Sequence, residues 1–194
     1  MKPRLVVLLL CASLLPAVQA FAKTILPDAC GDDSVKFEVK TENDQPAPEP
    51  PPAGKAQIVF IENSIKDGTP TVRYGMDGAW VGANKGNSYF YVTVDPGVHH
   101  LCAGWQSSQG RLQKSIDVAS FTAEPGKVYY FAASITMTGG GGGFIPPTMG
   151  PNGLSGGGPV MGGGILSFGL SQLNEDAGKY RVKAWKLAFW KTNK

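Results

Sequence analysis

The hydrophobic pattern along the chain has the two-residue period of β-strands. At residues 35–40, apolar Val35, Phe37 and Val39 alternate with charged residues, so one face of this segment is expected to be buried and the other to meet solvent. Similar apolar runs occupy 56–63, 71–78, 88–94, 98–105, 113–123, 127–137 and 165–173. Turn sequences such as MDG, DPG and EPG separate them. The pattern predicts an all-β fold, an antiparallel β-sandwich of about seven to eight strands.

Two segments of biased composition interrupt this pattern. Residues 45–54, QPAPEPPPAG, are rich in proline and predict an extended spacer. Residues 139–164 hold half of the 26 glycines of the chain, and ordering so much backbone would cost entropy, so we expect a flexible loop. The sandwich domain then covers 55–173 with the glycine-rich insert inside it, preceded by a strand segment at 23–44.

The first 22 residues have the features of a secretory signal peptide. Lys2 and Arg4 precede an apolar run from Leu5 to Leu15 that is too short to span a bilayer, and small residues follow it. Cleavage after Ala22 is favoured over cleavage after Ala20. Loss of the two basic residues lowers the formal net charge from +3 to +1, so overall charge points to no partner. We therefore expect an exported protein, periplasmic or extracellular.

The expected compartment decides how the cysteines are interpreted. Cys11 lies within the leader and follows Leu10 instead of the small residue that a lipoprotein signal requires, so lipid anchoring is the lesser alternative. Cys30 and Cys102 remain, and an even pair in an oxidising compartment predicts one disulfide. Two buried thiols are the alternative. Closing a loop of roughly 70 residues would stabilise the fold by about 4 kcal/mol on a chain-entropy estimate.

The 2 histidines of the chain lie side by side, at His99 and His100. On a strand they point to opposite faces and cannot bind one metal together. The sequence also lacks Cys-x-x-Cys and H-E-x-x-H spacings. We therefore predict no catalytic residue, no metal site and no cofactor, with one histidine at the surface and one half-buried. The alternative is a hydrolase that uses either histidine with Asp95 or Asp117.

The C-terminal segment, 174–194, has features of both a helix and a strand. Asn174 can cap a helix whose first turn holds Glu175 and Asp176. Gly178 weakens that prediction, and the alternation of KYRVKA is typical of a strand. Both structures stay open.

The aromatic residues of this tail are the candidate surface contacts: Trp185, Phe189 and Trp190. They stand among six Lys or Arg residues with no acid after Asp176. Packing of the aromatics on the sandwich, with the lysines in water, is the favoured interpretation. An anionic membrane surface is the alternative partner, and nucleic acid is not expected for an exported protein.

Three segments resemble the bacterial family catalogued as the domain of unknown function DUF2846, which is similar to PEGA-type domains. They are KAQIVFIE, GAWVGANKGNSYFYVTVDPGVHHL and FTAEPGKVYYFAAS, with a continuation at SFGLSQLNEDAGKYRV. The resemblance implies an exported, often lipid-anchored β-sandwich with no established enzyme activity or ligand. The chain departs from the family's pattern by lacking a lipobox and by adding the N-terminal strand segment and the glycine-rich insert.

Together these features favour a non-catalytic module of the cell envelope with a binding or structural role. The expected partner is an envelope component whose identity the sequence does not give. Peripheral membrane binding through the tail and histidine-dependent hydrolysis are the alternatives.

Overall fold

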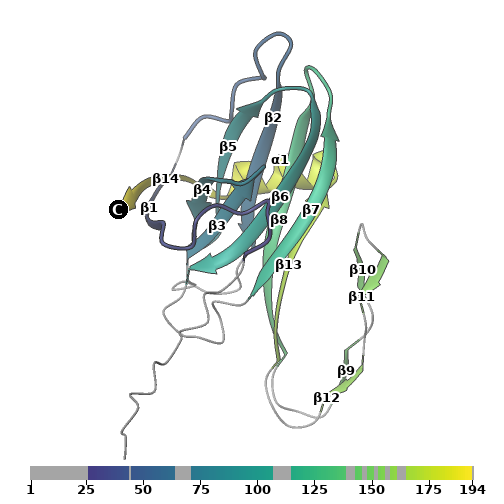
Figure 1. Ribbon diagram of the computed structural model, residues 1–194. Coiled ribbons are helices and arrows are strands. Elements are labelled where there is room, and N and C mark those ends of the chain that lie inside the picture. The colour runs from purple at the N-terminus through teal and green to yellow at the C-terminus, as the bar shows by residue number, and fades with distance from the viewer. Residues whose placement is uncertain are drawn as a thin grey trace, which may run out of the picture.

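The structure, a computed structural model, describes residues 26–43, 45–63, 71–106, 115–138, 143–145, 148–150, 153–155, 158–160 and 165–193. The signal peptide expected at 1–22 lies outside these residues. Ten strands form two sheets that pack face to face, with one short helix near the C-terminus (Figure 1). The all-β, sandwich-like class expected from the alternating pattern is confirmed.

The smaller sheet has four antiparallel strands. Their order across the sheet is β4 (Ala79–Asn84), β3 (Thr71–Met76), β6 (Gly97–Gln106) and β7 (Ile116–Ala123). Strand β4 was not expected, because its sequence AWVGAN is short and does not alternate cleanly. The turn from β3 to β4 places Asp77 and Gly78 at positive φ, as a tight hairpin connection requires.

The larger sheet has six strands and is mixed. Their order is β1 (Lys36–Glu42), β14 (Lys186–Asn193), β5 (Ser88–Val94), β2 (Ala56–Asn63), β8 (Val128–Thr138) and β13 (Ile165–Leu173). The pairs β2–β8 and β14–β5 are parallel, so the expectation of antiparallel pairing throughout is wrong for this sheet. Strands that are distant in sequence meet here, and local alternation carries no sign of their direction.

Two apolar clusters hold the layers together. The main core lies between the sheets, where Phe60, Tyr74 and Phe90 form a group of aromatic rings with centroids 4.8 to 5.4 Å apart. Phe37 and Val39 point into this core from β1, as their alternation predicted. The second cluster lies on the other face of the six-stranded sheet, beneath the helix.

The C-terminal segment contains both of the structures that its sequence suggested. Helix α1 (Glu175–Ala184) begins after Asn174, whose side chain accepts a hydrogen bond from the Ala177 N–H at 2.8 Å. Gly178 faces the sheet, where a Cβ would lie only 2.2 Å from the ring of Tyr130. Glycine therefore lets the helix approach β8 closely, and β14 follows directly after the helix.

The two segments of biased composition contribute no strand to the two sheets of the sandwich. The proline-rich stretch connects β1 to β2, and residues 47–51 line a hollow beside α1. In the glycine-rich insert the structure describes β9 (Gly143–Ile145), β10 (Thr148–Gly150), β11 (Gly153–Ser155) and β12 (Gly158–Val160). They form the antiparallel pairs β9–β12 and β10–β11. The remainder of the insert lies outside the described residues, and its flexibility stays a prediction.

Candidate functional site

Residues 27–35, called the N-terminal strap below, cross the outer face of the four-stranded sheet. The structure joins Cys30 of the strap to Cys102 of β6 in a disulfide, with the two Cα atoms 5.2 Å apart. This is the pairing that the cysteine count predicted. Close packing accompanies the bond, since a Cβ on Gly75 of β3 would lie 2.8 Å from the carbonyl oxygen of Ala29. The strap is therefore seated on the sheet by packing as well as by the covalent bond.

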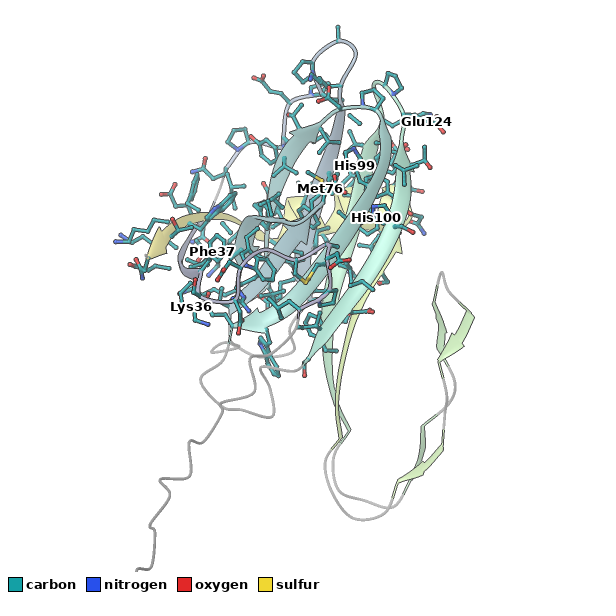
Figure 2. The ribbon with its side chains drawn as sticks, in the orientation of Figure 1. Lys36, Phe37, Met76, His99, His100 and Glu124 are labelled. Carbon is teal, nitrogen blue, oxygen red and sulfur yellow. A yellow bond between two sulfur atoms is a disulfide. The ribbon has the colours of Figure 1, made fainter. Side chains whose placement is uncertain are left out.

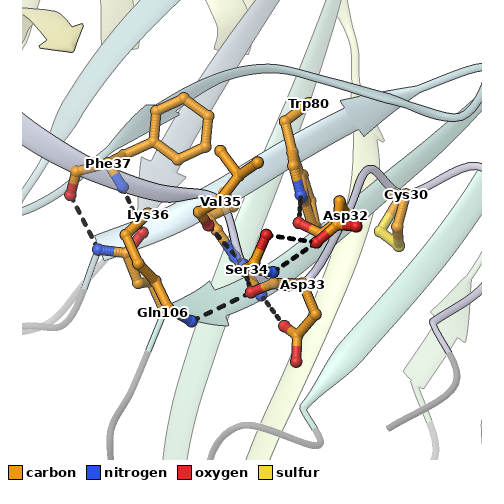
Figure 3. Close-up of polar contacts among 11 residues, drawn as sticks. Cys30, Asp32, Asp33, Ser34, Val35, Lys36, Phe37, Trp80 and Gln106 are labelled. Carbon is orange, nitrogen blue, oxygen red and sulfur yellow. Dashed lines mark hydrogen bonds and ion pairs between the residues drawn. A yellow bond between two sulfur atoms is a disulfide. The ribbon is translucent and has the colours of Figure 1, made fainter. Parts of the chain in front are cut away.

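Arg73 holds the next part of the strap. Its side chain lies almost wholly beneath the strap and donates hydrogen bonds to the carbonyls of Asp33 and Val35 at 3.3 and 3.0 Å. It also pairs with the Asp33 carboxylate at 3.0 Å. The guanidinium lies 4.4 Å from the ring centre of Trp80, whose indole N–H donates to the carbonyl of Asp32 at 2.7 Å (Figure 3). A buried cation is thus matched by several acceptors and an aromatic face.

Gln106 fixes the end of the strap where β1 begins. Its side-chain oxygen accepts from the Phe37 N–H at 2.7 Å, and its side-chain N–H donates to the Phe37 carbonyl at 2.8 Å (Figure 3). This pair of bonds imitates one rung of a β-ladder between β6 and β1. The strap is therefore anchored along its length before the chain enters the six-stranded sheet.

A hollow of about 570 Å³ opens between the strap and strands β6 and β7. It is lined by Pro27, Asp28, Ala29, Asp77, His100, Leu101, Val118, Ala119 and Ser120. Apolar side chains from the strap and β7 make most of the wall, while two carboxylates, one imidazole and one hydroxyl supply polar groups. A mainly apolar hollow with a few convergent polar groups is typical of a ligand-binding site.

The two histidines lie in different surroundings, as alternation on a strand predicted. The His99 side chain is 13% exposed and that of His100 is 66% exposed; Figure 2 labels both on β6. His99 points inward, where its ring lies 5.8 Å from that of Phe121. His100 points outward and lines the hollow.

Asp77 connects both histidines. One carboxylate oxygen lies 2.7 Å from His99 Nδ1, and the other accepts from the backbone N–H of His100 at 2.8 Å. The second ring nitrogen of His99 lies 2.8 Å from the carbonyl oxygen of Asp95. Both neighbours of the His99 ring are acceptors, so only the protonated imidazolium can donate to the two of them at once.

The charges of this group shift its pKa values in opposite directions. Partial burial lowers the pKa of His99, but its hydrogen bonds to Asp77 and Asp95 and the charges of these two carboxylates outweigh that effect, so the pKa is raised above its ordinary value. Partial burial raises the pKa of Asp77, but the bonds from His100 and His99 and their charges outweigh it and lower the pKa. Charged His99 and Asp77 therefore stabilise each other.

The hollow brings together three residue types used in nucleophilic catalysis: Asp77, His100 and Ser120. Ser120 of β7 lies directly opposite His100 of β6 in the strand register. The ring nitrogen Nδ1 of His100 is 3.7 Å from Asp77, longer than a hydrogen bond. Among the described residues no hydrogen bond joins Ser120 to His100, so the serine lacks the adjacent base that activates a nucleophile.

The carboxylates expected to partner a histidine have other roles. Asp95 offers its backbone carbonyl to His99, while its side chain forms an exposed ion pair with Lys55 at 2.5 Å. Asp117 lies at the seam between the sheets, where it accepts from the N–H of Val118 at 2.9 Å and from the N–H of Leu170 at 2.7 Å. Neither side chain forms a hydrogen bond with a histidine ring, whereas the Asp77 side chain does.

The aromatic tail residues are divided between packing and exposure. Trp190 lies against the main core, with its ring 4.7 Å from that of Phe90. Trp185 packs against the cluster beneath the helix, and the guanidinium of Arg181 lies 5.5 Å from its ring. Phe189 is 43% exposed. Of the three candidate surface contacts, only Phe189 presents a large apolar surface to solvent.

A further group of polar side chains lies inside the sandwich. Tyr74 donates to the carbonyl of Ile61 at 3.1 Å, and the side-chain amide of Asn84 lies 3.3 Å from the carbonyls of Phe60 and Ser88. Burial raises the pKa of Tyr74 well above its ordinary range. These bonds satisfy strand carbonyls within the core, which is a structural role.

Comparison with protein-family models, curated proteins and solved structures finds no match for the chain. The resemblance to DUF2846 therefore stays a prediction. In the described part of the chain, no cluster of three His, Cys, Asp or Glu side chains could hold a metal ion. No helix within the same residues has the length and hydropathy needed to cross a bilayer.

Sequence reasoning singled out His100 but missed the other residues that form the hollow. Asp77 occurs in a turn motif, MDG, and such motifs give no sign of a histidine on the neighbouring strand β6. Pro27 and Asp28 precede the first strand and carry no pattern of their own. The one available signal was Cys30, because a disulfide to Cys102 brings its neighbours onto β6.

Proposed function

We propose that the chain is an exported module of the cell envelope that binds a partner and does not catalyse a reaction. The observation that carries this proposal is the hollow of about 570 Å³ beside β6 and β7. Its walls come from four separate parts of the chain, and polar groups converge on an apolar surface. Such a surface offers both the burial that drives association and the groups that orient a partner.

The fixed geometry of the hollow supports binding. The strap that forms one wall is bonded to β6 through Cys30 and Cys102, and Arg73 and Trp80 hold its continuation. The opposite wall consists of paired β-strands. A site that is ordered before its partner arrives loses less conformational entropy on binding, which favours affinity.

Capture from envelope fractions by the purified, oxidised protein tests the proposal. Ser120→Arg places a long side chain in the hollow, and Thr93→Arg adds the same side chain to an exposed position on the other sheet. We expect Ser120→Arg to lose the captured component and Thr93→Arg to retain it. Equal capture by the two variants would reject the hollow as the binding site.

A hydrolase is the second candidate, because Asp77, His100 and Ser120 line the same hollow. Closure around a substrate would have to bring Ser120 within hydrogen-bond reach of the imidazole. The test is incubation with a fluorophosphonate probe and with p-nitrophenyl esters of increasing chain length. Labelling or turnover that Ser120→Ala and His100→Gln both abolish would favour the hydrolase over the binding module.

A further inference from the structure

Strand β7 leaves one side of the four-stranded sheet open. It is the last strand in the order β4-β3-β6-β7, and among the described strands only β6 pairs with it. Figure 1 shows β7 at the margin of this sheet, with the strands of the larger sheet behind it. An edge strand of this kind presents unpaired N–H and C=O groups that can bind another strand.

The register shows which backbone groups face the open side. The Asp77 N–H donates to the carbonyl of His100, so the backbone groups of His100 point toward β3. The neighbouring residues of β6, His99 and Leu101, therefore direct theirs toward β7, where they face Phe121 and Ala119.

The Trp105 N–H donates to the carbonyl of Ser115, so here too the odd-numbered residues of β6 and β7 direct their backbone groups toward each other. Alternation along β7 then directs the N–H and C=O groups of Val118, Ser120 and Thr122 away from the sheet.

Side chains protect the two ends of this edge and leave its middle open. Beyond Ala123, the Glu124 N–H donates to the Tyr129 hydroxyl at 2.9 Å. The Asp117 carboxylate accepts from the Val118 N–H at 2.9 Å and links it to the N–H of Leu170 in β13 at 2.7 Å. No other hydrogen bond among the described residues reaches the outward backbone groups of Ser120 or Thr122. The side chains of both residues are exposed. The edge thus stays available where it runs beside the hollow.

The hollow lies where side chains of an added strand would point. Successive side chains of a strand alternate between faces, so every second one would lie over the outer face, beside Val118 and Ser120. The apolar wall formed by Pro27, Val118 and Ala119 suits an aliphatic stem. Asp28 lines the same hollow, and among the described residues no ion pair involves it, whereas Asp77 is paired with His99. The complementary side chain is one with a long apolar stem and a cationic end.

We propose that β7 binds an extended segment of a partner protein as an added strand, with a Lys or Arg side chain of that segment in the hollow beside Asp28. This inference rests on the proposed binding function and names the kind of partner. A second copy of the chain fits less well, because Ile116–Ala123 contains no Lys or Arg. Two copies joined through β7 would leave Asp28 without its cation.

Three blocked seven-residue peptides test the inference. Each alternates valine and threonine, and the central residue is lysine, norleucine or glutamate. Fluorescence anisotropy gives the Kd of each, and amide hydrogen exchange reports on β7. We expect the lysine peptide to slow exchange at Ser120 and Thr122, and to bind more tightly than the norleucine peptide, with the glutamate peptide weakest. Asp28→Asn should weaken the lysine peptide by about fivefold and leave the norleucine peptide unchanged, because an exposed ion pair contributes modestly.

Two variants separate the backbone contribution from the charge. Ser120→Pro removes one outward N–H, and an edge strand tolerates proline. The variant should weaken the binding of the lysine and norleucine peptides by about tenfold. Val118→Lys should repel the lysine peptide. Tyr91→Lys is its control, because Val118 and Tyr91 are similarly exposed, at 42% and 40%, but lie on different sheets. If Ser120→Pro fails to fold, the folded and disulfide-bonded Val118→Lys protein still tests the inference.

Several results would overturn the inference. They are unchanged exchange at Thr122 with every peptide, equal affinity for the lysine and glutamate peptides, or unchanged affinity in both Ser120→Pro and Val118→Lys. A dimer that sedimentation detects and Val118→Lys dissociates would assign the edge to self-association instead. If all peptides fail while envelope capture still depends on the hollow, the added strand is rejected and the binding function stands.

Discussion

The two sheets have outer faces that are covered in different ways. On the four-stranded sheet, the strap is a single extended segment held by one disulfide, by Arg73 and by the indole of Trp80. On the six-stranded sheet, helix α1 packs an apolar surface that includes Val182 onto Tyr130 and its neighbours. One cover depends on a few specific bonds, and the other depends on burial of apolar area.

The difference shows what each cover allows. A helix buries a continuous apolar stripe and leaves little of the sheet beneath it open. A strap is too narrow to cover four strands, so the outer surface of β6 and β7 remains accessible beside it. The hollow with its carboxylates at Asp28 and Asp77 results directly from this incomplete cover.

Removal of the disulfide that holds the strap should have the largest effect. The double variant Cys30→Ala, Cys102→Ala releases a loop of 72 residues, and we expect the free energy of unfolding to fall by about 4 kcal/mol. Urea denaturation of the oxidised wild type and the variant measures the change. A loss below about 1 kcal/mol would show that Arg73 and Trp80 hold the strap without the covalent bond.

Gly178→Ala should have the next largest effect, on the helix side. Alanine at an open helix position stabilises by up to about 1 kcal/mol relative to glycine. Here the added Cβ would meet the Tyr130 ring at 2.2 Å, so we expect a loss of about 3 kcal/mol as the helix is displaced. Thermal unfolding of this variant and of Gly178→Ala combined with Tyr130→Leu tests the cause. Recovery in the double variant is expected, and its absence would reject the steric explanation.

Trp185→Ala distinguishes packing of the tail from membrane binding. The indole packs against the cluster beneath α1 but is only half-buried, so we expect a loss of about 2 kcal/mol, below the range for fully buried aromatics. Phe189→Ala, at an exposed site, is the matched control and should change stability much less. Salt-sensitive binding to anionic vesicles that disappears in a fully stable Trp185→Ala protein would instead favour the membrane alternative.

The smallest effect concerns pH and the His99–Asp77 pair. Because the pKa of His99 is raised in the folded protein, its contribution to stability is complete below about pH 6.5 and is lost as the pH rises through the folded value. The urea midpoint should therefore decline over that interval in the wild type. His99→Gln should flatten the profile, while His100→Gln, at the neighbouring exposed site, should keep it. A decline that persists in His99→Gln would assign the pH dependence to another group.

Local features of the sequence were sufficient for most strands. Alternation identified β1 through Phe37 and Val39, and the DPG turn marked the boundary between β5 and β6. These two strands do not pair with each other, because they lie in different sheets. Sequence signals for a helix were also present at Asn174, although the alternation of the following residues favoured a strand equally. Such signals act within a few residues, where backbone geometry limits the alternatives.

Long-range features could not be predicted in this way. The parallel pairing of β2 with β8 joins strands about 70 residues apart, and neither sequence carries a mark of its partner. The same is true of Asp77 and His99, whose contact depends on the pairing of β3 with β6. The disulfide was predictable only because the expected removal of the leader leaves two cysteines, so the pairing had no competitor.

The hairpin formed by β8 and β13 has a consequence for engineering this protein. The two strands pair continuously from Tyr130 opposite Leu173 to Thr138 opposite Ile165, so their register is set by the stem itself. The segment that connects the ends of two such paired strands can be lengthened at a free-energy cost that grows only with the logarithm of its length. The insert between β8 and β13 is therefore a natural site for an epitope tag, a fluorescent reporter or new chain termini.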